Sequence, residues 1–191
     1  MLRLGEPTRV HPLIQPYTLS HRWSGQFDEY VQIFTTCQVL GATVYTNISQ
    51  FPRNIIFDIC IVDEAGQITE PAILQVLLLA KQVLLVGDSK HLPPLVRNEI
   101  AINEGLNVSL LARLEKQWIE HKREKEGNEH GKKEVGNHCL WIAKLAIQYR
   151  MNEGVMKLAN HLIYQNCMKS GNEKVGINIM KIRNMWIMNK R

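Results

Sequence analysis

The fold is decided by the stretch Ile55-Ile-Phe-Asp-Ile-Cys-Ile-Val-Asp-Glu64, in which an apolar run of strand length ends abruptly at two acids. The run is continuously apolar rather than alternating, a pattern typical of a strand buried on both faces of a parallel sheet. Ligands of open α/β sheets bind at the carboxyl ends of such strands. The sequence therefore predicts that Asp63 and Glu64 lie where a ligand would bind.

A helix and a second strand are predicted directly after these acids. Thr69-Glu-Pro71 has the capping hydroxyl, first-turn acid and early proline of a helix start, and the apolar pattern predicts a helix to about Ala80. A second buried run, Gln82-Val-Leu-Leu-Val86, stops at Gly87-Asp88. Strand, helix and strand at this spacing predict a parallel βαβ unit. Both runs would then deliver their acids to the same sheet edge.

The rest of the chain is less regular. Residues 1–30 are rich in turn formers, and Val31-Gln-Ile-Phe-Thr-Thr36 is predicted to be a short strand because β-branched residues dominate it. Residues 105–117 have helical spacing of leucines. The segment 121–136 is almost entirely charged or small and is interpreted as a solvated insert.

Composition and charge narrow the class of protein. The 191 residues are 45% hydrophobic and 21% charged, which fits one globular α/β domain, or one domain and the start of another. A net charge of +5 is compatible with a nucleic-acid partner without requiring one. The four cysteines form no C-x-x-C pair, which disfavours a zinc site or a disulfide framework. The longest apolar stretch, residues 72–80, is too short to span a membrane.

The carboxylates suit nucleoside triphosphate hydrolysis, which requires Mg²⁺ on the phosphates, a positioned water and cations on the developing charge. Asp63 is placed to hold the metal, and Glu64 to polarise the attacking water. The alternative for the two acids is a helix start whose dipole they favour, and the alternative for Gly87-Asp88 alone is an ordinary turn. Their shared sheet edge favours the catalytic interpretation.

A third feature is Gln148-Tyr-Arg-Met151, which opens another helical segment. An aromatic face suits a nucleotide base, and a guanidinium suits phosphate. The alternative is a buried tyrosine beside a surface arginine, which would be the preferred interpretation if nothing accompanied it.

Together and in order, these pieces resemble the motifs of superfamily-1 helicases of the 1B group. Phe57–Gln67 resembles motif II, Val86–Val96 resembles motif III, and Gln148–Asn152 resembles motif IV. Further stretches resemble the helicase-nucleases of DNA replication in particular: Leu2–Gly5, Val10–Pro12, Thr35–Cys37, Leu106–Leu111 and Lys157–Asn160. The resemblance covers most of residues 1–175 apart from the charged insert.

The resemblance implies an α/β fold of the P-loop NTPase (RecA-like) type, and it implies roles for single residues. Asp63 would hold Mg²⁺, and Glu64 would activate water. Arg150 would act as an arginine finger. The nucleotide-binding set would be Asp63, Gln67, Gly87, Asp88, His91 and Tyr149, while Thr35 and Thr36 would meet single-stranded DNA.

The resemblance also implies an organisation and a setting. Residues 1–115 would be part of the first motor domain, 116–138 the charged insert, 139–175 the start of the second motor domain, and 176–191 an unassigned tail. The cofactors would be Mg²⁺ and ATP, with an iron–sulfur cluster only in full-length members. The partners would be single-stranded or flap DNA and replication and repair proteins, in the nucleus and also the mitochondrion.

Three departures from the helicase pattern qualify these expectations. No G-x-x-x-x-G-K-[ST] phosphate loop occurs in these residues, motif III has His91 where glutamine is usual, and the later motor motifs and nuclease domain are absent. We therefore expect an incomplete motor that alone hydrolyses ATP negligibly. An RNA-directed superfamily-1B helicase and a non-catalytic nucleic-acid-binding remnant are the alternatives, and an incomplete gene model would explain the same gaps.

Overall fold

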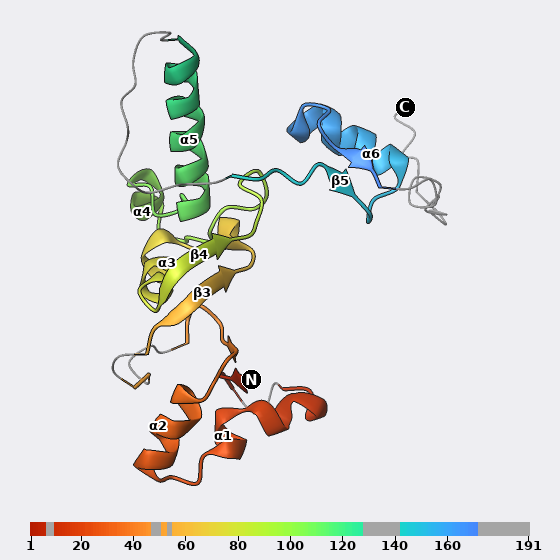
Figure 1. Cartoon of the computed structure of the whole chain (residues 1–191). Coiled ribbons are helices and arrows are strands. Elements are labelled where there is room, and N and C mark those ends of the chain that lie inside the picture. Colours follow the sequence, from red (N-terminus) through yellow and green to blue (C-terminus); the bar gives the residue numbers. More distant parts are fainter. Residues whose placement is uncertain (7–9, 47–50, 53–54, 128–141, 172–191) are drawn as a thin grey trace. The chain divides into compact units, whose positions relative to one another are not determined.

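The computed structural model describes residues 1–6, 10–46, 51–52, 55–127 and 142–171. The chain divides into two compact units, Met1–Lys132 and Lys133–Arg191 (Figure 1), and each is described by itself. The division falls inside the segment predicted as a charged insert. The tail predicted at 176–191 lies outside the described residues.

The centre of the first unit is the expected βαβ unit. Strands β3 (Phe57–Val62) and β4 (Ala80–Leu85) are parallel, and α3 (Glu70–Leu77) connects them. The register pairs Phe57 with Ala80 and Val62 with Leu85, so the two strands end side by side. Thr69 is the N-cap of α3, as predicted, although its side chain makes no capping hydrogen bond.

One face of this sheet is covered. Val62 and Ile73 pack with Leu110 of α5 (Leu110–Gly127) in a buried cluster, with Cys60 and Leu85 beside them. Burial raises the pKa of the Cys60 thiol.

The opposite face carries Ile59, Ile61 and Leu84, whose exposed fractions are 58%, 67% and 52%. The expectation that β3 is buried on both faces is therefore wrong within the described residues, because α3 and α5 cover only the face that carries Val62.

The N-terminal part of the first unit has a separate small core. Strands β1 (Leu2–Arg3) and β2 (Leu40–Gly41) pair in parallel, and Leu2, Leu4 and Phe34 are buried together. The short helices are η2 (Pro12–Tyr17, a 3-10 helix), α1 (Leu19–Arg22) and α2 (Phe27–Thr35).

The predicted strand at Val31–Thr36 is wrong, because these residues lie in α2 and at its C-terminal cap. Tyr30, Ile33 and Phe34 contact the small core, and their spacing is helical rather than alternating. Asp28 and Glu29 stand in the first turn, where acids favour a helix. Burial of a helical stripe has overridden the strand preference of β-branched residues.

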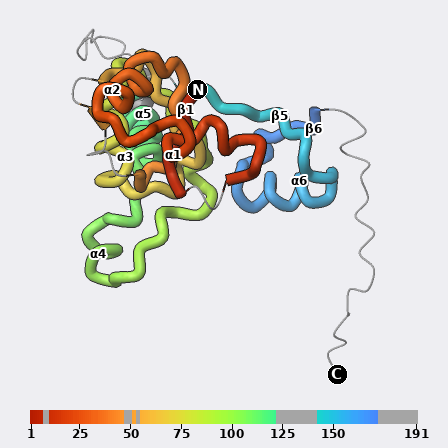
Figure 2. The backbone as a smooth tube through the Cα atoms, turned by 90° about the horizontal axis from the view of Figure 1, so that it is seen from below, coloured from red at the N-terminus to blue at the C-terminus, as the bar shows by residue number. Residues whose placement is uncertain are grey.

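A long connection joins β4 to α5, and it contains α4 (Glu99–Asn103). Figure 2 shows this connection standing out from the rest of the unit. Helix α5 begins at Leu110 rather than at residue 105, and it continues to Gly127. It therefore extends well into the segment that the sequence assigns to the insert.

The second unit is a small α/β arrangement. Strands β5 (Ile147–Gln148) and β6 (Lys169–Ser170) are parallel, and α6 (Glu153–Ala159) continues into the π-helical turn η5 (Asn160–Tyr164). In the described parts of both units, no helix is long and apolar enough to cross a membrane.

Candidate nucleotide-binding site

Asp63 and Glu64 follow β3 directly and begin the tight turn η4 (Ala65–Gln67). Glu64 has a φ of 52°, in the left-handed region that non-glycine residues rarely adopt. Such a conformation costs about 1–3 kcal/mol, and residues that adopt it cluster at ligand sites and active sites. Both acids are exposed, so their side chains are accessible to a ligand.

Two hydrogen bonds organise the turn. The backbone N–H of Glu64 donates to Oδ1 of Asp63 at 3.0 Å, and Nε2 of Gln67 donates to Oε2 of Glu64 at 3.0 Å. The structure therefore brings Asp63, Glu64 and Gln67 together in one turn. The amide of Gln67 orients the carboxylate of Glu64.

The turn after β3 packs against the loop after β4. The backbone N–H of Ala65 donates to the carbonyl of Val86 at 2.9 Å, and the N–H of Val86 donates to the carbonyl of Val62 at 2.8 Å. A Cβ on Gly66 would lie 2.6 Å from the carbonyl oxygen of Asp88. The backbones are therefore in van der Waals contact, and only glycine fits this arrangement of the two turns.

Gly87, in the loop after β4, makes a similar close contact with the turn after β3. A Cβ there would lie 3.0 Å from the backbone nitrogens of both Ala65 and Gly66, and 3.1 Å from Cδ2 of Leu111. Gly87 is thus confined between the turn and α5. The sequence predicts a nucleotide-binding role for Gly87, and the structure adds a packing role.

The loop that follows is a tight turn. Oδ1 of Asp88 accepts from the N–H of Lys90 at 2.9 Å, and the N–H of His91 donates to the Asp88 carbonyl at 3.3 Å. The hydroxyl of Ser89 donates to Oε2 of Glu115 on α5. His91 is exposed. The loop is therefore held by its own backbone and by α5, with the His91 side chain directed to the surface.

The donor set suits Mg²⁺ carried by a nucleotide. Magnesium usually takes one or two protein carboxylates and completes its shell with water and phosphate oxygens. Asp63 and Asp88 supply carboxylates at one edge of the sheet, and one oxygen of Asp63 has its geometry fixed by the Glu64 N–H. Within the described residues no group of three or more potential ligands is clustered, so a protein-only metal cage is not present there.

In the second unit, the side chain of Gln148 shapes the turn that carries Tyr149 and Arg150. Its Oε1 accepts from the N–H of Arg150 at 2.9 Å and of Met151 at 2.6 Å, while its Nε2 donates to the Met151 carbonyl at 2.8 Å. Tyr149 is 65% exposed, and its ring lies against Gly171, where a Cβ would be 2.1 Å from Cε1. Arg150 is exposed. Both side chains are therefore available to a ligand.

Thr35 and Thr36 lie elsewhere in the first unit, at the end of α2. Their hydroxyls donate to the carbonyl of Gln32 at 3.1 and 2.7 Å, which satisfies the helix end. Thr35 lines a hollow with residues from the amino end of β3, such as Phe57, whereas Asp63 follows the carboxyl end. The structure therefore does not bring Thr35 and Thr36 to the carboxylates.

Sequence reasoning missed three residues that organise the site: Ser89, Glu115 and Gln148. Glutamine directly before the Tyr-Arg pair was a visible signal for Gln148, because its amide can both donate and accept. No local pattern pointed to Ser89 and Glu115, which are 26 positions apart and meet only in the folded unit.

Comparison with known proteins shows what the chain is similar to. Residues 23–99 match the model of an AAA domain. The chain is 34% identical over 187 residues to the DNA replication ATP-dependent helicase/nuclease DNA2 of Homo sapiens, with 95% of this chain aligned. The chain is similar over most of its length to replication helicase/nucleases. Proteins with the same description in Schizosaccharomyces pombe and Saccharomyces cerevisiae are 32% and 33% identical, each over 92% of this chain.

The resemblance that the motifs predict is thereby confirmed, and so is the α/β, P-loop NTPase class of the fold. The chain spans 16% of the length of the human relative, 11% of the S. pombe relative and 10% of the S. cerevisiae relative. The matched AAA domain contains the turn after β3 and the loop after β4, whereas Tyr149 and Arg150 lie beyond it.

Proposed function

We propose that this chain is part of an ATP-dependent DNA helicase or translocase that moves 5′ to 3′ on single-stranded or flap DNA in nuclear replication and repair. The observation that carries the proposal is the contact between the turn with Asp63 and Glu64 and the loop with Gly87 and Asp88. A nucleotide phosphate at this edge would meet both segments. Similarity to proteins described as DNA replication ATP-dependent helicase/nucleases supports DNA rather than RNA as the substrate.

The residues have separate tasks in this proposal. Asp63 would hold the Mg²⁺ that supplies charge neutralisation on the phosphates. Glu64, oriented by the Gln67 amide, would accept a proton from the attacking water. The loop at Gly87 and Asp88 would detect the terminal phosphate through the turn that it contacts.

Motif IV supplies the other side of the nucleotide in the proposal. Tyr149 would lie near the base, and Arg150 would act as an arginine finger, a contribution worth about 10³–10⁵ in rate in other phosphoryl-transfer enzymes. Replication and repair proteins are the proposed partners of the longer protein. Its nuclease activity, and the iron–sulfur cluster of full-length members, are not encoded in these 191 residues.

The test is ATP hydrolysis by the native protein, purified from its source cells through an antibody against this chain. Hydrolysis stimulated by single-stranded DNA, and lost by at least about a hundredfold in a Glu64→Gln variant, is the expected result. Matched RNA should stimulate hydrolysis much less. Equal stimulation by RNA would favour an RNA-directed helicase, and no hydrolysis by any native form would favour a non-catalytic remnant.

A second test measures ATP hydrolysis by the 191-residue polypeptide alone. We expect negligible ATP hydrolysis from it, because no phosphate-loop lysine or loop of backbone donors is encoded in it. Robust DNA-stimulated turnover by this polypeptide, abolished by Glu64→Gln, would contradict the expectation.

A further inference from the structure

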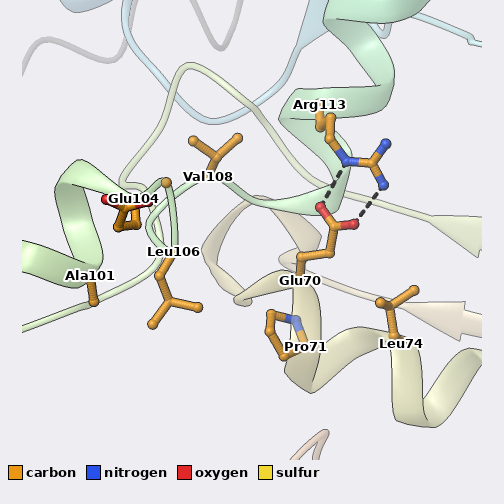
Figure 3. Close-up of a pocket in the computed structure, with 9 residues that line it drawn as sticks. Glu70, Pro71, Leu74, Ala101, Glu104, Leu106, Val108 and Arg113 are labelled. Atoms are coloured by element: carbon orange, nitrogen blue, oxygen red, sulfur yellow. Dashed lines mark hydrogen bonds and ion pairs between the residues drawn. The ribbon is translucent and has the colours of Figure 1, made fainter.

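A groove of about 550 Å³ lies in the first unit between the start of α3, the connection around α4 and the start of α5. Figure 3 shows its two sides, with Pro71 and Leu74 on one and Ala101 and Leu106 on the other. Val108 also lines it. Leu74, Leu106 and Val108 are 45%, 38% and 45% exposed, so the groove presents apolar side chains to solvent.

The wall that carries Leu106 is rigidly built. Gly105 has a φ of 88°, in the left-handed region. Two hydrogen bonds of 2.9 Å close the end of α4: the N–H of Leu106 donates to the carbonyl of Ala101, and the N–H of Gly105 donates to the carbonyl of Ile102. This pair of bonds is a Schellman motif, which typically brings together the two side chains at its ends, here Leu106 and Ala101. Asn98 caps the other end of α4.

The opposite wall is attached to α5 at two points. An antiparallel bridge joins Thr69 to Ser109, and Arg113 donates from Nε and Nη2 to the carboxylate of Glu70 at 2.8 and 2.6 Å (Figure 3). Both walls are therefore fixed before any ligand arrives. A preformed apolar groove loses little conformational entropy on binding.

The charge at the rim is negative. The guanidinium of Arg113 is occupied by Glu70, so these two charges cancel locally. Glu104 also lines the groove and is exposed, and within the described residues its carboxylate has no ion-pair or hydrogen-bond partner. The groove is thus locally acidic on a chain of net charge +5. Such a rim repels a nucleic-acid phosphate and attracts a cation.

We propose that this groove docks a short segment of a protein partner that carries a large apolar side chain next to a lysine or arginine. The apolar side chain would fill the space between Leu74 and Leu106, and the basic residue would pair with Glu104. Small hydrophobic anchors with a complementary charge at the rim are the usual basis of specific peptide docking. The surface is separate from the carboxylates proposed for ATP hydrolysis.

The test uses fluorescein-labelled synthetic peptides and the 191-residue chain, with fluorescence anisotropy as the measurement. The probe has Lys-Leu-Leu-Lys between glycine and serine flanks. One control peptide replaces the lysines with glutamates, and another replaces the leucines with serines. We expect the probe to bind more tightly than either control by about tenfold, because both the apolar anchor and its charge are required.

Two pairs of variants locate the binding. Glu104→Lys should weaken binding of the probe by about fivefold and improve binding of the glutamate peptide. Its control is Glu120→Lys, which makes the same charge change outside the groove and should leave binding of the probe unchanged. Leu106→Ser should weaken binding by about tenfold, whereas Leu78→Ser removes a leucine that is 82% exposed elsewhere.

Three outcomes would overturn the proposal. The first is equal binding of the probe and the glutamate peptide. The second is an equal loss in Glu104→Lys and Glu120→Lys, which would indicate general electrostatic attraction. The third is self-association of the chain that Leu106→Ser abolishes, because the groove would then accept a second copy. Circular dichroism of each variant shows whether the fold is retained, and Glu104→Lys, a surface change, provides the answer if Leu106→Ser does not fold.

Discussion

At the scale of single residues, the turn after β3 depends on glycines that stand at backbone contacts. A side chain at Gly87 would be tightly confined, because a Cβ would lie 3.0 Å from two backbone nitrogens. Nitrogen atoms of the backbone cannot rotate away as the end of a flexible side chain can. The two loops would have to give by a few tenths of an ångström to accept a methyl group.

The prediction is that Gly87→Ala lowers the free energy of unfolding of the first unit by about 1–3 kcal/mol, the usual cost of overpacking. Urea denaturation followed by circular dichroism measures it. Gly41→Ala is the matched control in the same unit, because a Cβ there is 4.0 Å from its nearest atom. An equal, small change in both variants would show that the loops are not in contact.

The ion pair of Glu70 and Arg113 predicts a dependence on pH. Two hydrogen bonds from Arg113 lower the pKa of the Glu70 carboxyl below its ordinary value, and its charge contributes further. A group whose pKa is lower in the folded state stabilises the protein above its unfolded pKa. That stabilisation is lost as the pH falls through the folded pKa.

Glu70→Gln should therefore cost about 1 kcal/mol of unfolding free energy near neutral pH, discounted for the partial exposure of the pair, and less at about pH 3, which is below the ordinary pKa of a glutamate. Urea denaturation at both pH values measures the difference. Asp58→Asn tests an ion pair whose carboxylate is almost fully exposed, and we expect little change from it at either pH. A Glu70→Gln effect that is the same at both pH values would contradict the assignment.

At the scale of elements, α5 connects most of the features described. Its first turns contact the buried cluster around Val62, the turn η4, the loop through Glu115 and α3 through Arg113. The helix starts after Ser109, whose hydroxyl accepts from the N–H of Ala112 at 3.1 Å and whose side chain is buried. The start of α5 is therefore part of the buried core of the first unit.

Ser109→Ala should destabilise the first unit by about 1–2 kcal/mol, because the cap is lost and the N–H of Ala112 loses its hydrogen-bond acceptor. Thermal denaturation measures the effect. Ser20→Ala is the control, since that hydroxyl makes one hydrogen bond in an exposed helix. Protection of the α5 amides from hydrogen exchange should fall in Ser109→Ala alone. Unchanged protection would show that the cap does not hold the helix start.

The βαβ unit could be predicted from the sequence because its signals are local: continuous apolar runs, a Thr-Glu-Pro helix start and acids at the strand ends. Helix α2 could not be predicted in this way. The residues Val31, Ile33 and Thr35 prefer strands, but burial of one helical face against the small core determines the structure that forms. The contacts of Ser89 with Glu115 and of Glu70 with Arg113 join residues far apart in the chain, and no periodicity reveals them.

At the scale of the whole molecule, the sheet of the first unit has one open apolar face. Ile59, Ile61 and Leu84 are more than half exposed there, on strands with unpaired edges among the described residues. An exposed flat apolar strand pair favours association with other chains.

Ile61→Lys should reduce concentration-dependent association of the 191-residue chain without unfolding it, because burying a charge on the apolar face against another chain is unfavourable. Light scattering at increasing concentration measures it. Leu78→Lys, at an exposed leucine beyond the sheet face, should have a smaller effect. Equal effects would mean that general charge, rather than this face, governs solubility.

The contact of Gly66 with the Asp88 carbonyl has a mechanical consequence. Most moving parts of proteins are separated by side chains, whose rotation absorbs small displacements before the next element feels them. Here two backbones touch with nothing compressible between them. A shift of one turn toward the other, by even a few tenths of an ångström, must therefore displace it, and the hydrogen bond from the Ala65 N–H to the Val86 carbonyl couples the two when they move apart.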